Sequence, residues 1–185
     1  MNSLEELAKQ IKSCTKCELC KYRINAVPGE GLESAKIMLV GEAPGKTEDM
    51  TGKPFVGKAG ELLDEALEEA SLSREELFIT NVVKCRPPGN RKPKAAEIEA
   101  CRNYLLQQIN IVRPKVIVTL GLTALQFFKD AERMQELPFE YTSGNERITV
   151  YPTYHPAAAL RGNKIARESI YRTMKEIKNY KHSKY

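Results

Sequence analysis

Four of the five cysteines are spaced in a way that predicts a metal or iron–sulfur centre. Cys14 and Cys17 form a Cys-x-x-Cys pair, while Cys85 and Cys101 lie far along the chain. Such a set can close tetrahedrally around zinc or hold a [4Fe–4S] cluster, and the spacing alone does not choose between them. Cys20 also has a ferredoxin-like interval to the pair, but no Cys-Pro follows it, so we leave it outside the set.

Four further segments carry polar and aromatic groups that suit a ligand site. Residues 41–45 include two glycines and a proline, a turn whose backbone N–H groups can approach a ligand closely. Phe55 lies in a loop between glycines and a proline, where its ring can stack on a base. Asn81 offers a donor beside an acceptor, and His155 is one of only two histidines. Each also has a common structural role, as a turn former, a core ring or a satisfied histidine, so none decides the function alone.

The charge pattern is compatible with a nucleic-acid partner. The formal net charge is +5, and Lys and Arg cluster at residues 84–94 and from Arg161 to the end of the chain. A basic surface of this kind favours a polyanion. On charge alone, however, a lysine-rich protein without such a partner fits equally well.

The hydrophobic pattern predicts an α/β fold with a central four-stranded parallel sheet flanked by helices. Short apolar runs predict strands at 36–40, 77–80, 115–120 and 147–151. Helical spacing predicts helices at 3–14, 60–70, 95–112, 122–129 and 164–180, with 130–145 irregular or a hairpin. Because ligands bind beyond the carboxyl ends of parallel strands, this order gathers the polar segments on one rim: 41–45, 81–86, 121 and 154–161.

Length and composition set broad limits. The 185 residues fit one compact domain, residues 1–185. No apolar run approaches the roughly 20 residues that span a bilayer, and the N-terminus lacks the apolar stretch of a secretory signal. We therefore expect a cytoplasmic protein without membrane contact, in which disulfides are not expected.

Together, these motifs resemble the family-4 uracil-DNA glycosylases, the iron–sulfur branch of that superfamily. The resemblance runs from Cys14 to about Arg161 and rests on four motifs in the family's order: Gly-Glu-Ala-Pro-Gly, Gly-Lys-Pro-Phe-Val-Gly, Thr-Asn-Val-Val-Lys-Cys-Arg-Pro-Pro and His-Pro-Ala-Ala-Ala-Leu-Arg. It implies a base-excision repair enzyme that flips uracil out of DNA, hydrolyses the N-glycosidic bond and leaves an abasic site.

The resemblance also implies specific ligands. It implies a structural [4Fe–4S] cluster that ties the N-terminal segment to the DNA-binding side, held by Cys14, Cys17, Cys85 and Cys101. It implies a uracil pocket formed by Gly41, Glu42, Ala43, Phe55, Asn81 and His155. The implied partner is uracil-containing DNA, single- or double-stranded, bound by a monomer.

The reaction suggests a role for each pocket side chain. Phe55 would stack on the flipped base, and Asn81 would donate to O4 and accept from N3–H. A neutral His155 would donate to O2 as negative charge develops there.

Water activation is less defined by the sequence. Better-known uracil glycosylases carry an Asp at the position of Ala43, and family-1 enzymes carry a Tyr at the position of Gly45. Glu42 is our candidate for orienting water or stabilising the sugar cation. Glu48 is our candidate for filling the space of that Tyr, next to the uracil.

DNA contacts are predicted on the same side. Leu160 and Arg161 would enter the duplex and fill the gap left by the flipped base. Phosphate contacts are predicted for Lys84, Arg86, Arg91 and Lys92.

Two other functions also fit parts of the pattern. A non-catalytic iron–sulfur or zinc module would bind nucleic acid without releasing a base. A small-molecule enzyme on a flavodoxin-like architecture, such as a phosphate-ester hydrolase, lacks here the aspartates and metal ligands that its chemistry usually needs.

Overall fold

A computed structural model describes residues 3–182 of the chain, so the last part of the basic C-terminal stretch, residues 183–185, lies outside it. Within the described range the chain forms a six-stranded sheet in the order β1-β3-β2-β4-β6-β5. The strands are β1 (Glu30–Gly31), β2 (Ile37–Gly41), β3 (Phe78–Asn81), β4 (Val116–Leu120), β5 (Phe139–Ser143) and β6 (Glu146–Thr153). The four middle strands run parallel, whereas β1 and β5 pair antiparallel at the two edges.

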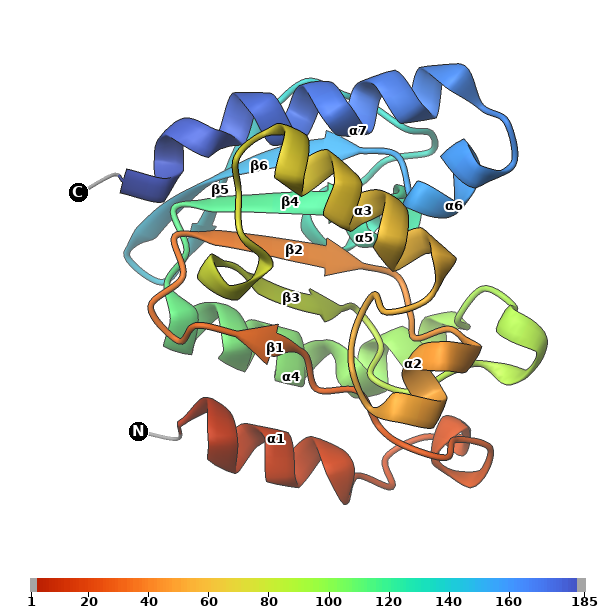
Figure 1. The fold of residues 1–185 in the computed structure, drawn as a ribbon. Helices are drawn as coiled ribbons and strands as arrows, with labels where there is room; N and C mark the ends of the chain where they lie inside the picture. Colours follow the sequence, from red (N-terminus) through yellow and green to blue (C-terminus); the bar gives the residue numbers. More distant parts are fainter. Residues whose placement is uncertain (1–2, 183–185) are drawn as a thin grey trace.

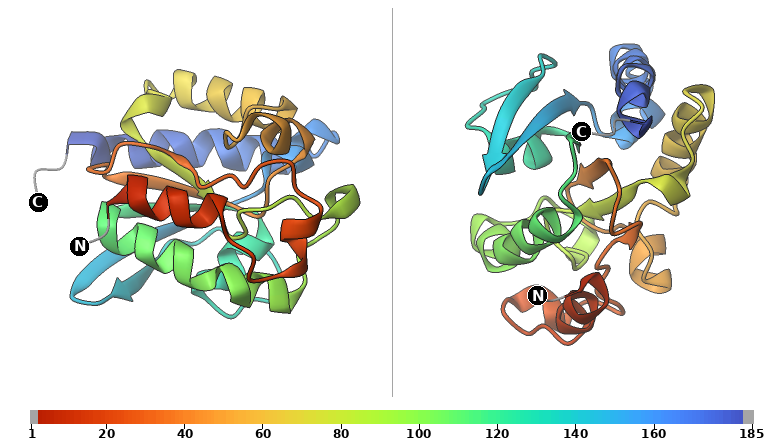
Figure 2. Two further views of the ribbon diagram at one scale, coloured as in Figure 1. Left: turned by 90° about the horizontal axis from the view of Figure 1, so that it is seen from below. Right: turned by 90° about the vertical axis from the view of Figure 1, so that its left-hand side faces the viewer.

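Helices cover both faces of the sheet (Figures 1 and 2). One core joins the sheet to α1, α4 and α5, and a second core joins it to α3 and α7. The α-helices are α1 (Leu4–Lys12), α2 (Lys46–Thr51), α3 (Lys58–Glu69), α4 (Ala95–Val112), α5 (Leu122–Phe128), α6 (Pro156–Leu160) and α7 (Lys164–Ile177). The 3-10 helices are η1 (Glu18–Lys21), η2 (Arg74–Glu76), η3 (Pro88–Asn90) and η4 (Lys178–His182).

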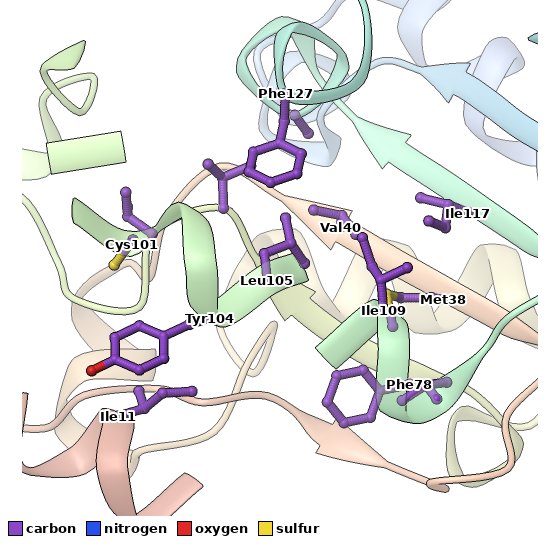
Figure 3. Packing of buried hydrophobic residues seen from close by; sticks show 14 of the residues in the cluster. Ile11, Met38, Val40, Phe78, Cys101, Tyr104, Leu105, Ile109, Ile117 and Phe127 are labelled. Atoms are coloured by element: carbon purple, nitrogen blue, oxygen red, sulfur yellow. The ribbon is translucent and has the colours of Figure 1, made fainter. Parts of the chain in front are cut away.

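The central strands are buried on both faces, as their continuous apolar runs predict. Every residue of β2, β3 and β4 is buried. Because side chains alternate along a strand, Met38 and Val40 enter one core while Leu39 enters the other. Figure 3 shows the first core, in which Leu105 and Ile109 of α4 pack over the sheet.

The predicted parallel centre of the sheet is confirmed, and the differences lie at its edges. Helix α4 has the predicted bounds, and most other ends shift by one to three residues. Residues 130–145 contain β5, which forms the alternative hairpin with β6. Strand β1 and helix α2 were not predicted, because a two-residue strand and a six-residue helix carry too few residues for a period to emerge.

The parallel strands bring the predicted polar segments to one edge. Gly41 at the end of β2 pairs with Asn81 at the end of β3, and Leu120 of β4 pairs with Thr153 of β6. The chain segments that follow these four ends form one rim. Among the described residues, none of the helices combines the length and apolar character needed to cross a bilayer.

Candidate functional site

A cavity of about 620 Å³ opens at this rim. Its size is typical of pockets that bind small organic ligands, roughly 300–1,000 Å³. The loops after β2, β3, β4 and β6 all contribute to its lining. Six of the seven residues predicted to contact uracil line it: Glu42, Ala43, Glu48, Phe55, Asn81 and His155.

The seventh residue, Gly41, lies behind the lining and leaves space for the side chains of Asn81 and Phe55. A Cβ atom at this position would stand 2.4 Å from Asn81 Oδ1 and 2.5 Å from Phe55 Cζ. Real side chains do not approach so closely, so any larger residue would displace the ring or the carboxamide. Glycine is required here for packing.

Asn81, which lines the cavity, has a buried side-chain carbonyl without a partner in the described part of the chain. Its side chain is only 1% exposed, and Oδ1 is buried without a hydrogen-bond partner among residues 3–182. Buried polar atoms are nearly always paired, because an unpaired one costs about 1–3 kcal/mol. A ligand with a suitable donor would remove this cost.

Two rings form another part of the wall. The Phe55 and His155 ring centroids are 5.8 Å apart, and the ring planes are tilted by 33°. Phe55 is 5% exposed and has a φ of 49°, in the left-handed region that side-chain-bearing residues rarely adopt. Its loop must therefore be held by the surrounding structure.

His155 is a neutral hydrogen-bond donor. It is the N-cap of α6, and its Nδ1 accepts a 3.1 Å hydrogen bond from the Ala157 N–H. The ring proton consequently resides on Nε2. Burial, with repulsion from Arg161 as a smaller cause, lowers the pKa of His155 from 6.5 to about 4. At neutral pH the imidazole can donate from Nε2 but carries no charge.

The two carboxylates of the lining have different surroundings. Glu42 accepts a short hydrogen bond from the Thr123 hydroxyl. Thr123 was not among the predicted site residues, although its place just after β4 at the rim was a usable signal. Glu48 accepts from the backbone N–H groups of Gly45 at 3.1 Å, Val56 at 3.0 Å and Gly57 at 2.9 Å. Glu48 thus joins the first turn to the Phe55 loop.

The prediction that Lys84 contacts phosphate is wrong. Its side chain is 1% exposed, and Nζ donates within the core to Thr80 Oγ1, the Asn81 carbonyl and Gln108 Oε1 at 2.6–2.7 Å. This nitrogen is held inside the core and cannot reach DNA, and burial lowers its pKa to about 7. A basic cluster in sequence is divided by the strand-to-helix turn, which directs some of its members inward.

The other predicted DNA contacts remain near the surface. Arg161 and Lys92 are exposed and line the cavity, and Leu160 is 49% exposed on α6. Arg91 lines the cavity too, but its guanidinium pairs with Glu97 through two hydrogen bonds of 2.7 and 2.8 Å. Arg86 lies outside the lining and donates to Asn90 Oδ1 at 2.7 Å.

All five cysteines line a second, smaller pocket between the N-terminal segment and α4. Cys85 and Cys101 are buried, and Arg23 donates to Cys85 Sγ at 3.0 Å. Burial raises the pKa of the Cys85 thiol to about 11 despite this contact. Within residues 3–182, no three Cys, His, Asp or Glu side chains form a group that could hold one metal ion. Cys20, which the sequence left outside the set, lines this pocket with the other four.

Comparison with known proteins agrees with the geometry. The model of the uracil DNA glycosylase superfamily matches residues 28–177. Type-4 uracil-DNA glycosylases of Sulfurisphaera tokodaii and Saccharolobus solfataricus are 48% and 47% identical to the chain, over 86% and 95% of it and 77% and 87% of their own lengths. A type-5 uracil-DNA glycosylase of Pyrobaculum aerophilum is 30% identical over 80% of the chain and 72% of its own length. The chain therefore belongs to the uracil-DNA glycosylase superfamily and, within it, to the type-4 family.

Proposed function

We propose that this chain is a monofunctional uracil-DNA glycosylase of base-excision repair. It hydrolyses the N-glycosidic bond of a flipped deoxyuridine, releases free uracil and leaves an abasic site. One observation carries the proposal: a ring, a carboxamide with an unpaired oxygen and a neutral imidazole meet in one cavity of a type-4 family member.

Base recognition follows from the donors and acceptors of the pocket. Phe55 stacks on the extruded base, and Asn81 accepts from N3–H while its amide group donates to O4. Cytosine carries an acceptor at N3 and a donor at N4, the reverse pattern. Because cytosine would leave the buried polar groups of Asn81 unpaired, the site rejects it strongly.

Bond cleavage needs stabilisation of two developing charges. The departing uracil becomes negative, and Nε2–H of the neutral His155 donates to O2. The sugar becomes positive, and Glu42, oriented by Thr123, stabilises it or orients the attacking water. Ala43 stands at the position of the Asp of other families and cannot take this role. Of the two carboxylates in the lining, Glu48 is already hydrogen-bonded to three backbone N–H groups, which leaves Glu42 as the candidate.

DNA is bound at the mouth of the cavity. Leu160 enters the stack and occupies the gap that the flipped base leaves. Arg161 and Lys92 contact phosphates, with Arg86 and Arg91 as weaker contributors because each is already hydrogen-bonded to a side chain. The site is built from a single chain, so a monomer acting on uracil-containing DNA in the cytoplasm suffices.

The cysteine pocket suits a [4Fe–4S] cluster held by Cys14, Cys17, Cys85 and Cys101. Among the residues that the structure describes, its lining contains five thiols and no His, Asp or Glu, and the Arg23 guanidinium supplies positive charge toward Cys85. Each iron of such a cluster takes one thiolate, so the sulfurs need not meet at one ion. When bound, the cluster acts as a structural link that ties the N-terminal segment to α4 in a single domain.

The function is tested by incubating the protein, purified under anaerobic conditions, with oligonucleotides that contain one deoxyuridine. We expect free uracil and strand scission only after alkali, from single- or double-stranded substrate. Matched oligonucleotides with cytosine or thymine should stay intact. DNA binding without any uracil release would instead support a non-catalytic nucleic-acid module.

The cluster is tested separately with Cys85→Ser. The unmodified protein should be brown, contain iron rather than zinc and absorb broadly in the visible range. The variant should lose colour and melt at a lower temperature. A colourless variant that is equally heat-stable would refute the structural role.

A further inference from the structure

The loop that carries Phe55 holds a conformation that its own residues disfavour. Phe55 has a φ of 49°, and its carbonyl lies against α3, where a Cβ on Gly60 would stand 1.8 Å from the oxygen. The ring is turned into the cavity beside Asn81. Since the left-handed region is sterically unfavourable for a phenylalanine, contacts outside the loop must maintain it.

One side chain, Arg74, holds the carbonyl side of this loop. Its Nη1 donates to the Phe55 carbonyl at 2.9 Å, and its Nη2 donates to the Pro54 carbonyl. Two consecutive carbonyls are therefore bound by one guanidinium. On the opposite side of the loop, Glu48 accepts from the N–H groups that follow Phe55.

Arg74 is itself fixed by two carboxylates. Asp64 of α3 accepts from Nη1 at 2.9 Å, and Glu30 of β1 lies 3.3 Å from Nη2. The Arg74 side chain is 22% exposed, less than either carboxylate partner. The planar guanidinium offers five N–H donors in a fixed arrangement, which a lysine cannot reproduce.

We propose that Arg74 is a positioning residue for base recognition: it locks the Phe55 loop so that the ring is ready to stack on the flipped base. The proposal rests on the function proposed above. Arg74 contacts the backbone of the loop, so its effect on the reaction must pass through Phe55. Neither the sequence motifs nor the family resemblance singles this arginine out, since it lies outside all four motifs.

The test is a double-mutant cycle of Arg74→Met with Phe55→Leu. Arg74→Met keeps the apolar stem and removes every donor. We expect it to lower kcat/KM for uracil release about 10- to 100-fold in the unmodified background, and less than about 3-fold in the Phe55→Leu background. Lys115→Met is the matched control, because Lys115 forms a 3.7 Å ion pair with Glu146 just before β4, at the end of the sheet opposite the cavity, and should leave activity unchanged.

Two further measurements separate positioning from general destabilisation. Inhibition by free uracil should weaken about as much as kcat/KM in Arg74→Met, whereas affinity for DNA that already contains an abasic site should stay the same. Arg74→Lys keeps the charge toward Glu30 and Asp64, but its three N–H donors on one nitrogen cannot serve two carbonyls and two carboxylates at once. It should remain folded and still bind free uracil weakly, which covers the case in which Arg74→Met fails to fold.

Three results overturn the proposal. Equal losses in both Phe55 backgrounds, accompanied by a parallel fall in melting temperature, would make Arg74 merely structural. Full activity and uracil affinity in Arg74→Lys would reduce it to an ion pair. If the unmodified protein releases no uracil, both the proposed function and the role of Arg74 fail. If it releases uracil but the variants behave as in the first two results, only the role of Arg74 fails.

Discussion

His155→Asn separates the proposed catalytic donor from the structural cap that the same side chain provides. Asparagine is a favoured N-cap residue, so its Oδ1 can replace Nδ1 as acceptor of the Ala157 N–H and preserve the start of α6. Its side chain is too short to replace Nε2–H. We therefore expect kcat to fall about 10²- to 10³-fold, the usual cost of one oxyanion donor, with little change in melting temperature at pH 7.

The same substitution should change how stability depends on pH. The folded-state pKa of His155 is about 4, below the usual histidine value of 6.5, so between these values the unfolded chain binds a proton that the folded chain does not. Stability must therefore fall as pH falls from 6.5 to about 4. At 1.36 kcal/mol for each pKa unit, the loss from this group reaches about 3 kcal/mol, and below pH 4 it grows no further.

Urea unfolding of both proteins at pH 7.0, 5.5 and 4.0, under anaerobic conditions, measures this difference. The two proteins share every other titratable group, so subtracting the two curves isolates the effect of the histidine. The unmodified protein should lose up to about 3 kcal/mol more than His155→Asn, and its kcat should persist well below pH 6.5. Parallel stability curves, or loss of kcat with a midpoint near 6.5, would refute a neutral imidazole with a lowered pKa.

Three other substitutions test the rest of the site. Asn81→Asp should lower kcat/KM for uracil about 10- to 100-fold and reduce the preference for uracil over cytosine. A carboxyl that is protonated because of burial can donate to N3 of cytosine and accept from its N4. An unchanged preference in assays on paired oligonucleotides would contradict base reading by Asn81. Gly41→Ala should lower activity at least 10-fold, because its Cβ would meet Asn81 and Phe55. The control is Gly144→Asn in the turn between β5 and β6, where no atom lies within 4 Å and asparagine tolerates the φ of 59°, and it should retain activity; equal activities of the two variants would contradict the close packing at Gly41. Lys92→Gln should reduce the slope of log affinity against log salt by about 0.7 on single-stranded DNA. Arg91→Gln should reduce it by less, because Glu97 already neutralises Arg91. Equal slopes for the two variants in a fluorescence titration would contradict the weaker role of Arg91.

The sequence predicted the central fold well because strong periodic signals coincide with its most buried parts. Helix α4 has 18 residues with helical spacing, and β2 and β4 are continuous apolar runs bounded by glycine. The rim followed from the rule that ligands bind beyond the carboxyl ends of parallel strands. The edge strand β1 was not predicted, because it depends on a long-range pairing with β3 and two residues carry no sequence pattern that indicates it.

Side-chain direction is what the sequence could not supply. Lys84, Arg86 and Arg91 form one basic stretch, yet the turn after β3 sends Lys84 into the core and leaves Arg86 part-exposed. Local patterns did not indicate Arg74, since its partner Phe55 stands 19 residues away. Thr123 could have been proposed from its place just after β4, but its contact with Glu42 spans 81 residues and does not follow from the sequence. Contacts of this kind depend on how elements pack, and local patterns do not encode them.

The cavity concentrates features that the folded chain would not keep for stability alone. An unpaired buried carbonyl at Asn81 costs about 1–3 kcal/mol, and a left-handed phenylalanine costs about 1–3 kcal/mol more. A desolvated histidine adds a further penalty in acid. Elsewhere in residues 3–182, Thr119 Oγ1 is the one other buried side-chain nitrogen or oxygen without a partner, and outside the cavity lining Ser71 and Arg113 are the other non-glycine residues with a left-handed φ. Since strain and unsatisfied groups persist where binding repays them, their meeting in one pocket argues that this pocket is shaped in advance for a ligand with a flat face and a polar edge.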